Sequence, residues 1–231
     1  MRHGQTPANL LSQLDTAIPG APLTARGQSQ AEAIPAAFTG ETLDDGTPGA
    51  SGSIGAIFVS TLLRTQLTAA PLAAQLTLKP QVLDGLREVS AGGIEMLSDP
   101  ESLKIYTSTA FAWAGGDLDL RMPHGSTVPG ESGHEFFARY DAAIATIRRC
   151  GHSTVMAVSH GAAIRTWVAA RCVNTDGSFA GDNQLDNTGM AVLESEGDDE
   201  WRLVAWHRAP VGGMELNDDD AVDPIGETVQ G

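Results

Sequence analysis

Four short stretches of the sequence carry residue types that together could handle a phosphoryl group. Arg2 and His3 stand in an Arg-His-Gly turn at the start of the chain, and Arg64, Glu88 and His160 follow at wide intervals. A phosphoryl group spreads its charge over three oxygens, so a site that cleaves its ester must surround them with cations and hydrogen-bond donors. Arginine meets this need with a planar fork that stays charged at any working pH.

The same residues could supply the nucleophile and the acid of such a reaction. A neutral imidazole nitrogen can attack phosphorus without a metal, and a carboxylic acid with a raised pKa usually protonates the departing alkoxide. Each residue also has an ordinary interpretation: Arg64 as a surface helix residue, Glu88 as a solvated loop acid, and His160 as a structural histidine. The residues alone do not select Glu88 over Glu95 or Glu131 as the acid.

Two predicted strand-helix units would bring these residues to one edge of a sheet. The apolar run over residues 54–59 predicts a strand buried on both faces, and a helix is expected over 62–76. Residues 154–172 repeat this pattern, with His160 in the connection. Because open parallel sheets bind ligands at the carboxyl ends of their strands, Arg64 and His160 are expected to lie near each other.

The remaining segments predict a mixed α/β protein. A helix should begin after Thr24 as N-cap and run to about residue 38, another should cover 135–150, and an antiparallel hairpin should form from 187–196 and 201–207. A catalytic turn in such a fold normally follows a buried strand, yet only Met1 precedes Arg2. We therefore expect either an apolar segment upstream of this sequence or a sheet that lacks one strand.

Length and composition favour one acidic domain. The 231 residues suit a single unit over 1–212, with residues 213–231 as a disordered acidic tail. The net charge of -15 argues against nucleic acid and anionic membranes as partners. The acidic runs at 44–45, 198–200 and 218–220 are expected to lie on the solvated surface, and the more specific alternative is that they bind metal. We expect no cofactor and no metal site.

The cysteines and the apolar runs point to the cytoplasm. Cys150 and Cys172 do not have the spacing of a disulfide framework or a zinc site. No stretch reaches the roughly 20 apolar residues of a membrane span, and the N-terminus lacks the apolar core of a signal peptide.

With these stretches taken together, the chain resembles the histidine phosphatase superfamily, in its phosphoglycerate mutase-like branch. The resemblance spans residues 2–165 and rests on Arg2-His3-Gly4-Gln5-Thr6 with Asn9, Leu23-Thr24, Ser60 through Arg64, Leu86-Arg87-Glu88, Gly130-Glu131-Ser132 with Arg139, and Ser159-His160-Gly161. It implies a three-layer α/β/α sandwich with a mostly parallel central sheet, and it allows a homodimer.

The resemblance also implies roles for individual residues. His3 would be the nucleophile that becomes phosphohistidine, while Arg2, Arg64 and His160 would hold the phosphoryl oxygens. Glu88 would be the general acid and then the base that activates water. Asn9 would add a phosphate contact and Thr24 a substrate contact, and Glu131 would order the loop. Two departures from the family pattern stand out: Gln5 replaces a commoner glutamate, and Met96 replaces a glycine that often follows the position of Glu95.

The resulting prediction is a metal-independent phosphomonoester hydrolase of the histidine acid phosphatase type, acting on a small phosphorylated metabolite. The alternatives are a phosphoglycerate mutase, or a non-catalytic scaffold that binds phosphorylated ligands. A mutase needs extra cations for the substrate carboxylate, but the expected lid over residues 97–129 contains only Lys104 and Arg121. The lid also contains the large apolar residues Tyr106, Phe111, Trp113, Leu118 and Met122. They should either face the substrate or pack the lid onto the body, and packing is favoured.

Overall fold

The computed structural model describes residues 1–38, 54–195 and 200–218. The loop predicted over 40–53 and the acidic pairs Asp44-Asp45 and Asp198-Asp199 lie outside the described residues. Every helix and strand expected from the sequence is present in the described part of the chain, with ends that differ by a few residues.

Two groups of strands form the centre of the molecule. Strand β1 pairs in parallel with both of its neighbours, in the order β2-β1-β3, and β4 and β5 form a separate antiparallel hairpin. The strands are β1 (Ala56–Val59), β2 (Gln81–Val82), β3 (Val155–Val158), β4 (Met190–Ser195) and β5 (Trp201–His207).

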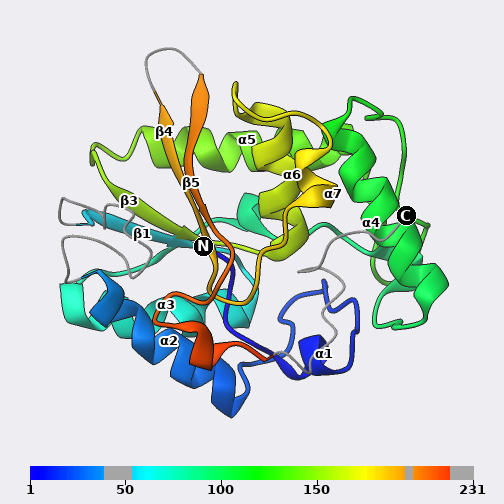
Figure 1. Ribbon diagram of the computed structural model, residues 1–231. Helices are drawn as coiled ribbons and strands as arrows, with labels where there is room; N and C mark the ends of the chain where they lie inside the picture. The colour runs from blue at the N-terminus through cyan, green and yellow to red at the C-terminus, as the bar shows by residue number, and fades with distance from the viewer. Residues whose placement is uncertain (39–53, 196–199, 219–231) are drawn as a thin grey trace.

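Helices cover both faces of the parallel sheet (Figure 1). On one side are α2 (Ala25–Ala37) and α3 (Leu63–Leu76); on the other are α4 (Pro100–Ala114), α5 (Gly133–Arg148) and α6 (Gly161–Arg171). Shorter elements join these: α1 (Pro7–Leu10), α7 (Phe179–Asp182) and the 3-10 turns η1 (Asp84–Leu86), η2 (Gly92–Ile94) and η3 (Met214–Leu216).

The alternation of side chains along β1 explains the three layers. Ile57 and Val59 pack with residues of α2 and α3, whereas Phe58 packs with residues of α4, α5 and α6. A strand whose neighbouring side chains point to opposite faces must be covered on both when all of them are apolar. This arrangement confirms the three-layer α/β/α fold with a mostly parallel sheet.

Polar caps set where the long helices begin. Thr24 caps α2 as expected, since its hydroxyl accepts a hydrogen bond from the backbone N–H of Gly27. Ser132 and Glu135 form a reciprocal capping box at the start of α5, and Asp99 caps α4. These side chains satisfy backbone donors that a helix start leaves without partners.

Residues 1–3 occupy the strand position that the sequence left open. Ser159 donates to the Met1 carbonyl (2.9 Å) and its own carbonyl accepts from the His3 N–H (3.1 Å). On the other side, the Arg2 N–H donates to the Gly189 carbonyl (2.8 Å). These three residues thus bridge β3 and the chain that leads into β4.

The expected C-terminal tail is ordered at its start. Residues 214–216 form η3, which packs against α2, and the Gln30 side chain donates to the Leu216 carbonyl (2.9 Å). The part of the tail over 219–231 lies outside the described residues. None of the helices described in the structure is both long and apolar enough to cross a membrane.

Candidate active site

The structure brings together the five side chains that the sequence singled out. Arg2 and His3 follow the short strand position beside β3, Arg64 lies in the first turn of α3 after β1, and His160 is the N-cap of α6 after β3. The rings of His3 and His160 lie 5.2 Å apart between centroids. The charges of Arg2 and Arg64 both act on Glu88, which follows η1.

His3 is held as a neutral ring with one free nitrogen. Its Nδ1 lies 2.8 Å from the Gly4 carbonyl, which can only accept, so Nδ1 carries the proton and Nε2 keeps its lone pair. Burial lowers the pKa of His3 well below its ordinary value, and the charges of Arg64 and Arg2 act in the same direction. A neutral imidazole with an exposed lone pair can act as a nucleophile.

The turn that carries His3 is fixed by side chains from other elements. The Gly4 N–H donates to Thr68 Oγ1 (2.9 Å) on α3, and Asn187 Nδ2 donates to the His3 carbonyl (3.1 Å). Gly4 also lies against α2, because a Cβ at this position would come within 2.7 Å of the Gly27 carbonyl oxygen. Glycine is therefore required in the turn for close packing.

Both arginines are buried and anchored by carbonyl groups. Arg2 Nη1 donates to the Leu185 carbonyl (2.6 Å), and Arg64 Nη2 donates to the Asp15 carbonyl (2.8 Å). The carboxylate of Asp15 also lies 3.4 Å from Arg64 Nη1. No sequence pattern pointed to Asp15, because it stands 49 positions before its partner in a loop without regular structure.

A small network of hydroxyl groups orients His160. Its Nε2 lies 2.8 Å from Ser60 Oγ, which in turn contacts Thr65 Oγ1 at 3.1 Å. The other ring nitrogen, Nδ1, is buried and has no hydrogen-bond partner among the residues that the structure describes. Burial lowers the pKa of His160 well below its ordinary value, with Arg64 and His3 adding to this effect, so the ring is neutral.

Glu88 is fully buried beside the start of α6. Its Oε1 accepts from the backbone N–H groups of Val89 (2.9 Å) and Ala163 (2.9 Å), and its Oε2 from that of Ala162 (3.3 Å). Burial raises the pKa of the carboxyl group, while these N–H groups and the two arginines oppose the shift. Loss of solvation therefore dominates and favours the protonated acid.

The two carboxylates that competed with Glu88 in the sequence have other partners. Glu131 accepts from Arg139 Nη2 (2.6 Å) and from the backbone N–H of Ser90 (2.7 Å), next to the segment that carries Glu88. Glu95 accepts from the N–H groups of Thr16 and Ala17, both at 2.8 Å. These contacts order loops.

Asn9 and Thr24 lie close to the His3 turn but are engaged in local contacts. Asn9 Oδ1 accepts from the Thr6 N–H (2.9 Å), which leaves Nδ2 as the group that could donate to a phosphoryl oxygen. The Thr24 hydroxyl caps α2 and donates to Gln5 Oε1 (2.8 Å). Their contacts with phosphate and substrate remain predictions.

The large apolar residues of the expected lid belong to the core. Tyr106, Phe111, Trp113 and Met122 are buried among residues of α5 and α6, and Leu118 packs against the same cluster. The Tyr106 hydroxyl donates to the Val89 carbonyl (2.9 Å). The packing interpretation is therefore correct.

Comparison with known proteins assigns the family. A sequence model of the histidine phosphatase superfamily (branch 1) matches residues 1–209. The chain belongs to this superfamily. The match covers every residue of the site described above, from Arg2 to His160.

A much longer protein is similar to this chain in sequence. A PE-PGRS family protein of Mycobacterium tuberculosis is 36% identical over 227 residues, which cover 94% of this chain but only 37% of that protein. This chain thus spans little more than a third of that relative's length.

Solved structures share the fold at low identity. A mycobacterial glucosyl-3-phosphoglycerate phosphatase has a TM-score of 0.68 and 22% identity, covering 90% of this chain and 96% of that one. The α-ribazole phosphatase of Shigella flexneri has a TM-score of 0.65 and 21% identity, covering 92% and 96%.

Proposed function

We propose that this chain hydrolyses phosphomonoesters through a phosphohistidine intermediate on His3. The arrangement that carries the proposal is the neutral His3 ring, with its free Nε2, beside two buried arginines and a buried carboxylic acid. The names of the two phosphatases with the same fold support the same class of reaction. The histidine acid phosphatase type is the mechanism that we infer.

In the first step, His3 Nε2 attacks phosphorus and the ester P–O bond breaks as the P–N bond forms. Arg2 and Arg64 neutralise the charge on the phosphoryl oxygens, and preorganised cations of this kind act most strongly where water is excluded. The Glu88 carboxylic acid gives its proton to the departing alkoxide.

In the second step, water releases the phosphoryl group. The Glu88 carboxylate takes a proton from the water while the water oxygen attacks phosphorus, and the P–N bond breaks. Inorganic phosphate leaves, His3 Nε2 regains its lone pair, and Glu88 is protonated again. Each step uses only side chains that lie together in the site.

A turnover assay with p-nitrophenyl phosphate tests this proposal. His3→Ala should abolish release of p-nitrophenol, since no other nucleophile is proposed. His134→Ala is the matched control, because that histidine is exposed on α5 and contacts Asp119. Equal rates for His3→Ala and the unaltered chain would contradict the nucleophile assignment. Trapping of acid-labile phosphate on the protein, absent in His3→Ala, gives a second readout.

A further inference from the structure

Met96 is the third residue of a type II turn over residues 94–97, in which the Leu97 N–H donates to the Ile94 carbonyl (3.1 Å). Its φ angle is +63°, in the left-handed region that glycine enters freely and other residues enter at an energetic cost. Glycine or asparagine is the usual residue at the third position of a type II turn. Met96 therefore has a long apolar side chain at a position whose backbone conformation favours glycine.

Burial does not offset that cost. The Met96 side chain is 48% exposed, so packing in the interior does not account for it. Thr77 has a similar φ of +55° and ends α3 in the left-handed cap conformation that is common at helix ends. Non-glycine residues held in such conformations gather at binding sites, where the strain is compatible with function.

Met96 stands next to the loop that holds the catalytic arginine. Its N–H donates to the Leu14 carbonyl (3.0 Å), and the Leu14 N–H donates to the Leu97 carbonyl (3.1 Å). The next residue along, Asp15, anchors Arg64. The backbone contacts thus place Met96 beside the rim of the proposed phosphoryl site.

Other exposed apolar side chains gather on the same segments. Of the eleven large apolar residues exposed in the described part of the chain, six belong to α1, to the loop that follows it, or to segments hydrogen-bonded to that loop. They are Leu10, Leu11, Ile18, Leu63, Met96 and Leu97. Exposed apolar side chains on segments next to a charged site favour a ligand with one charged end and one apolar end.

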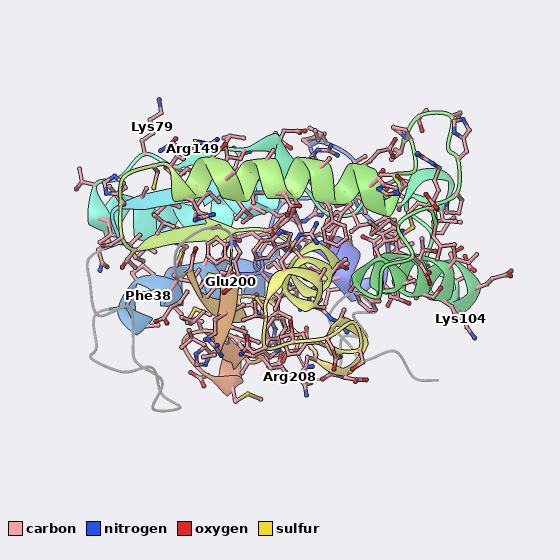
Figure 2. All side chains as sticks on the ribbon, turned by 90° about the horizontal axis from the view of Figure 1, so that it is seen from above. Phe38, Lys79, Lys104, Arg149, Glu200 and Arg208 are labelled. Atoms are coloured by element: carbon pink, nitrogen blue, oxygen red, sulfur yellow. The ribbon has the colours of Figure 1, made fainter. Side chains whose placement is uncertain are left out.

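The basic residue next to Glu88 and the two in the segment 97–129 have acidic partners or extend away from the body. Arg87 pairs with Asp84 (2.8 Å), and Arg121 pairs with Glu135 (2.8 Å). Lys104 lies at the outer edge of α4 and extends away from the body (Figure 2). None of these three side chains is therefore held in place for a second anionic group on the substrate.

We propose that Met96 is a specificity-determining residue that contacts an apolar, uncharged leaving group of the phosphomonoester substrate. The inference rests on the proposed function for the position of the phosphoryl group. Methionine suits such a contact because its flexible, polarizable side chain adapts to irregular apolar surfaces.

Binding of alkylphosphonates, which cannot be hydrolysed, tests the inference independently of turnover. Hexylphosphonate should bind at least about tenfold more tightly than methylphosphonate, since each buried methylene is worth about fourfold in affinity. 3-Phosphonopropionate, which adds a carboxylate, should bind no more tightly than methylphosphonate. Met96→Gly should reduce the hexyl-to-methyl ratio severalfold, and the variant should fold because glycine adopts this conformation freely.

Thr77→Gly is the matched control, since it makes the same change at a left-handed residue at the far end of α3. It should leave the ratio unaltered, and thermal unfolding of both variants should confirm that they are folded. An unchanged ratio in Met96→Gly, tighter binding of the carboxylated ligand, or no binding of any phosphonate would overturn the inference. Absence of turnover together with the expected binding ratios would instead contradict the proposed function alone.

Discussion

At the scale of single residues, the site depends on opposite pKa shifts with one common cause. Burial lowers the pKa of His3 and raises that of Glu88, because in both cases the charged form loses solvation. Burial thereby favours the neutral ring of His3, the proposed nucleophile, and the protonated form of Glu88, the proposed acid. Pairs of groups shifted apart in this way indicate the division of roles between nucleophile and acid.

These shifts predict the pH dependence of kcat/KM. Activity should fall on the acidic side as His3 becomes protonated, at a pH below about 6.5, and on the alkaline side as Glu88 ionises, at a pH above about 4.5. Glu88→Gln should lower kcat by about 100-fold or more and remove the alkaline limb that belongs to the acid. Substrate ionisation affects both proteins equally and cancels in the ratio of their kcat/KM values, so a ratio that stays constant across the alkaline limb would contradict the assignment.

At the scale of elements, one ion pair holds the segment that carries Glu88. Arg139 on α5 donates to the carbonyl groups of Gly85, Arg87 and Glu88 while it pairs with Glu131. Both members of the pair are largely buried. Helix α5 therefore fixes the segment from Gly85 to Glu88, which has no strand pairing of its own to hold it.

Arg139→Ala should lower the free energy of unfolding by about 3–5 kcal/mol, because it leaves the Glu131 carboxylate buried without its partner. Urea unfolding measures this loss. Arg171→Ala is the control, since its pair with Asp141 is more than one third exposed and should contribute about 1 kcal/mol or less. Equal losses in the two variants would show that the Arg139 pair has no special structural role.

At the scale of the whole molecule, the two ends of the described chain meet beside the turn that carries His3. Gln5 Nε2 donates to Asp218 Oδ2 (2.8 Å), and Arg26 lies 3.6 Å from the same carboxylate. The family pattern more often has glutamate at the position of Gln5, which would put two carboxylates in contact here. Glutamine instead allows the C-terminal segment to close over α2.

A double-mutant cycle on Gln5 and Asp218 tests this closure. Asp218→Ala should cost about 1.5 kcal/mol, as for a partly buried hydrogen bond to a charged group. Gln5→Glu should cost more in the unaltered chain than in the Asp218→Ala background, because like charges then oppose each other. A cost that is the same in both backgrounds would mean that the two side chains do not interact in solution.

The sequence alone predicted the architecture and singled out the candidate site residues that the structure brings together. Apolar runs of strand length, each followed by a helical pattern, place Arg64 and His160 at the carboxyl ends of neighbouring parallel strands, because that topology brings such ends together. Local sequence patterns also predicted Thr24 as the N-cap of α2 and the hairpin of β4 and β5. The family resemblance, rather than spacing, selected Glu88 from three acidic candidates.

Only the tertiary structure decided which partners these residues have. The pairs Asp15 with Arg64, Ser60 with His160 and Gln5 with Asp218 join positions 49, 100 and 213 residues apart. No local pattern encodes such contacts, since they arise when separately formed elements pack. The same holds for Met96, whose residue type is visible in the sequence but whose left-handed backbone and exposed side chain depend on how its loop is held against Leu14.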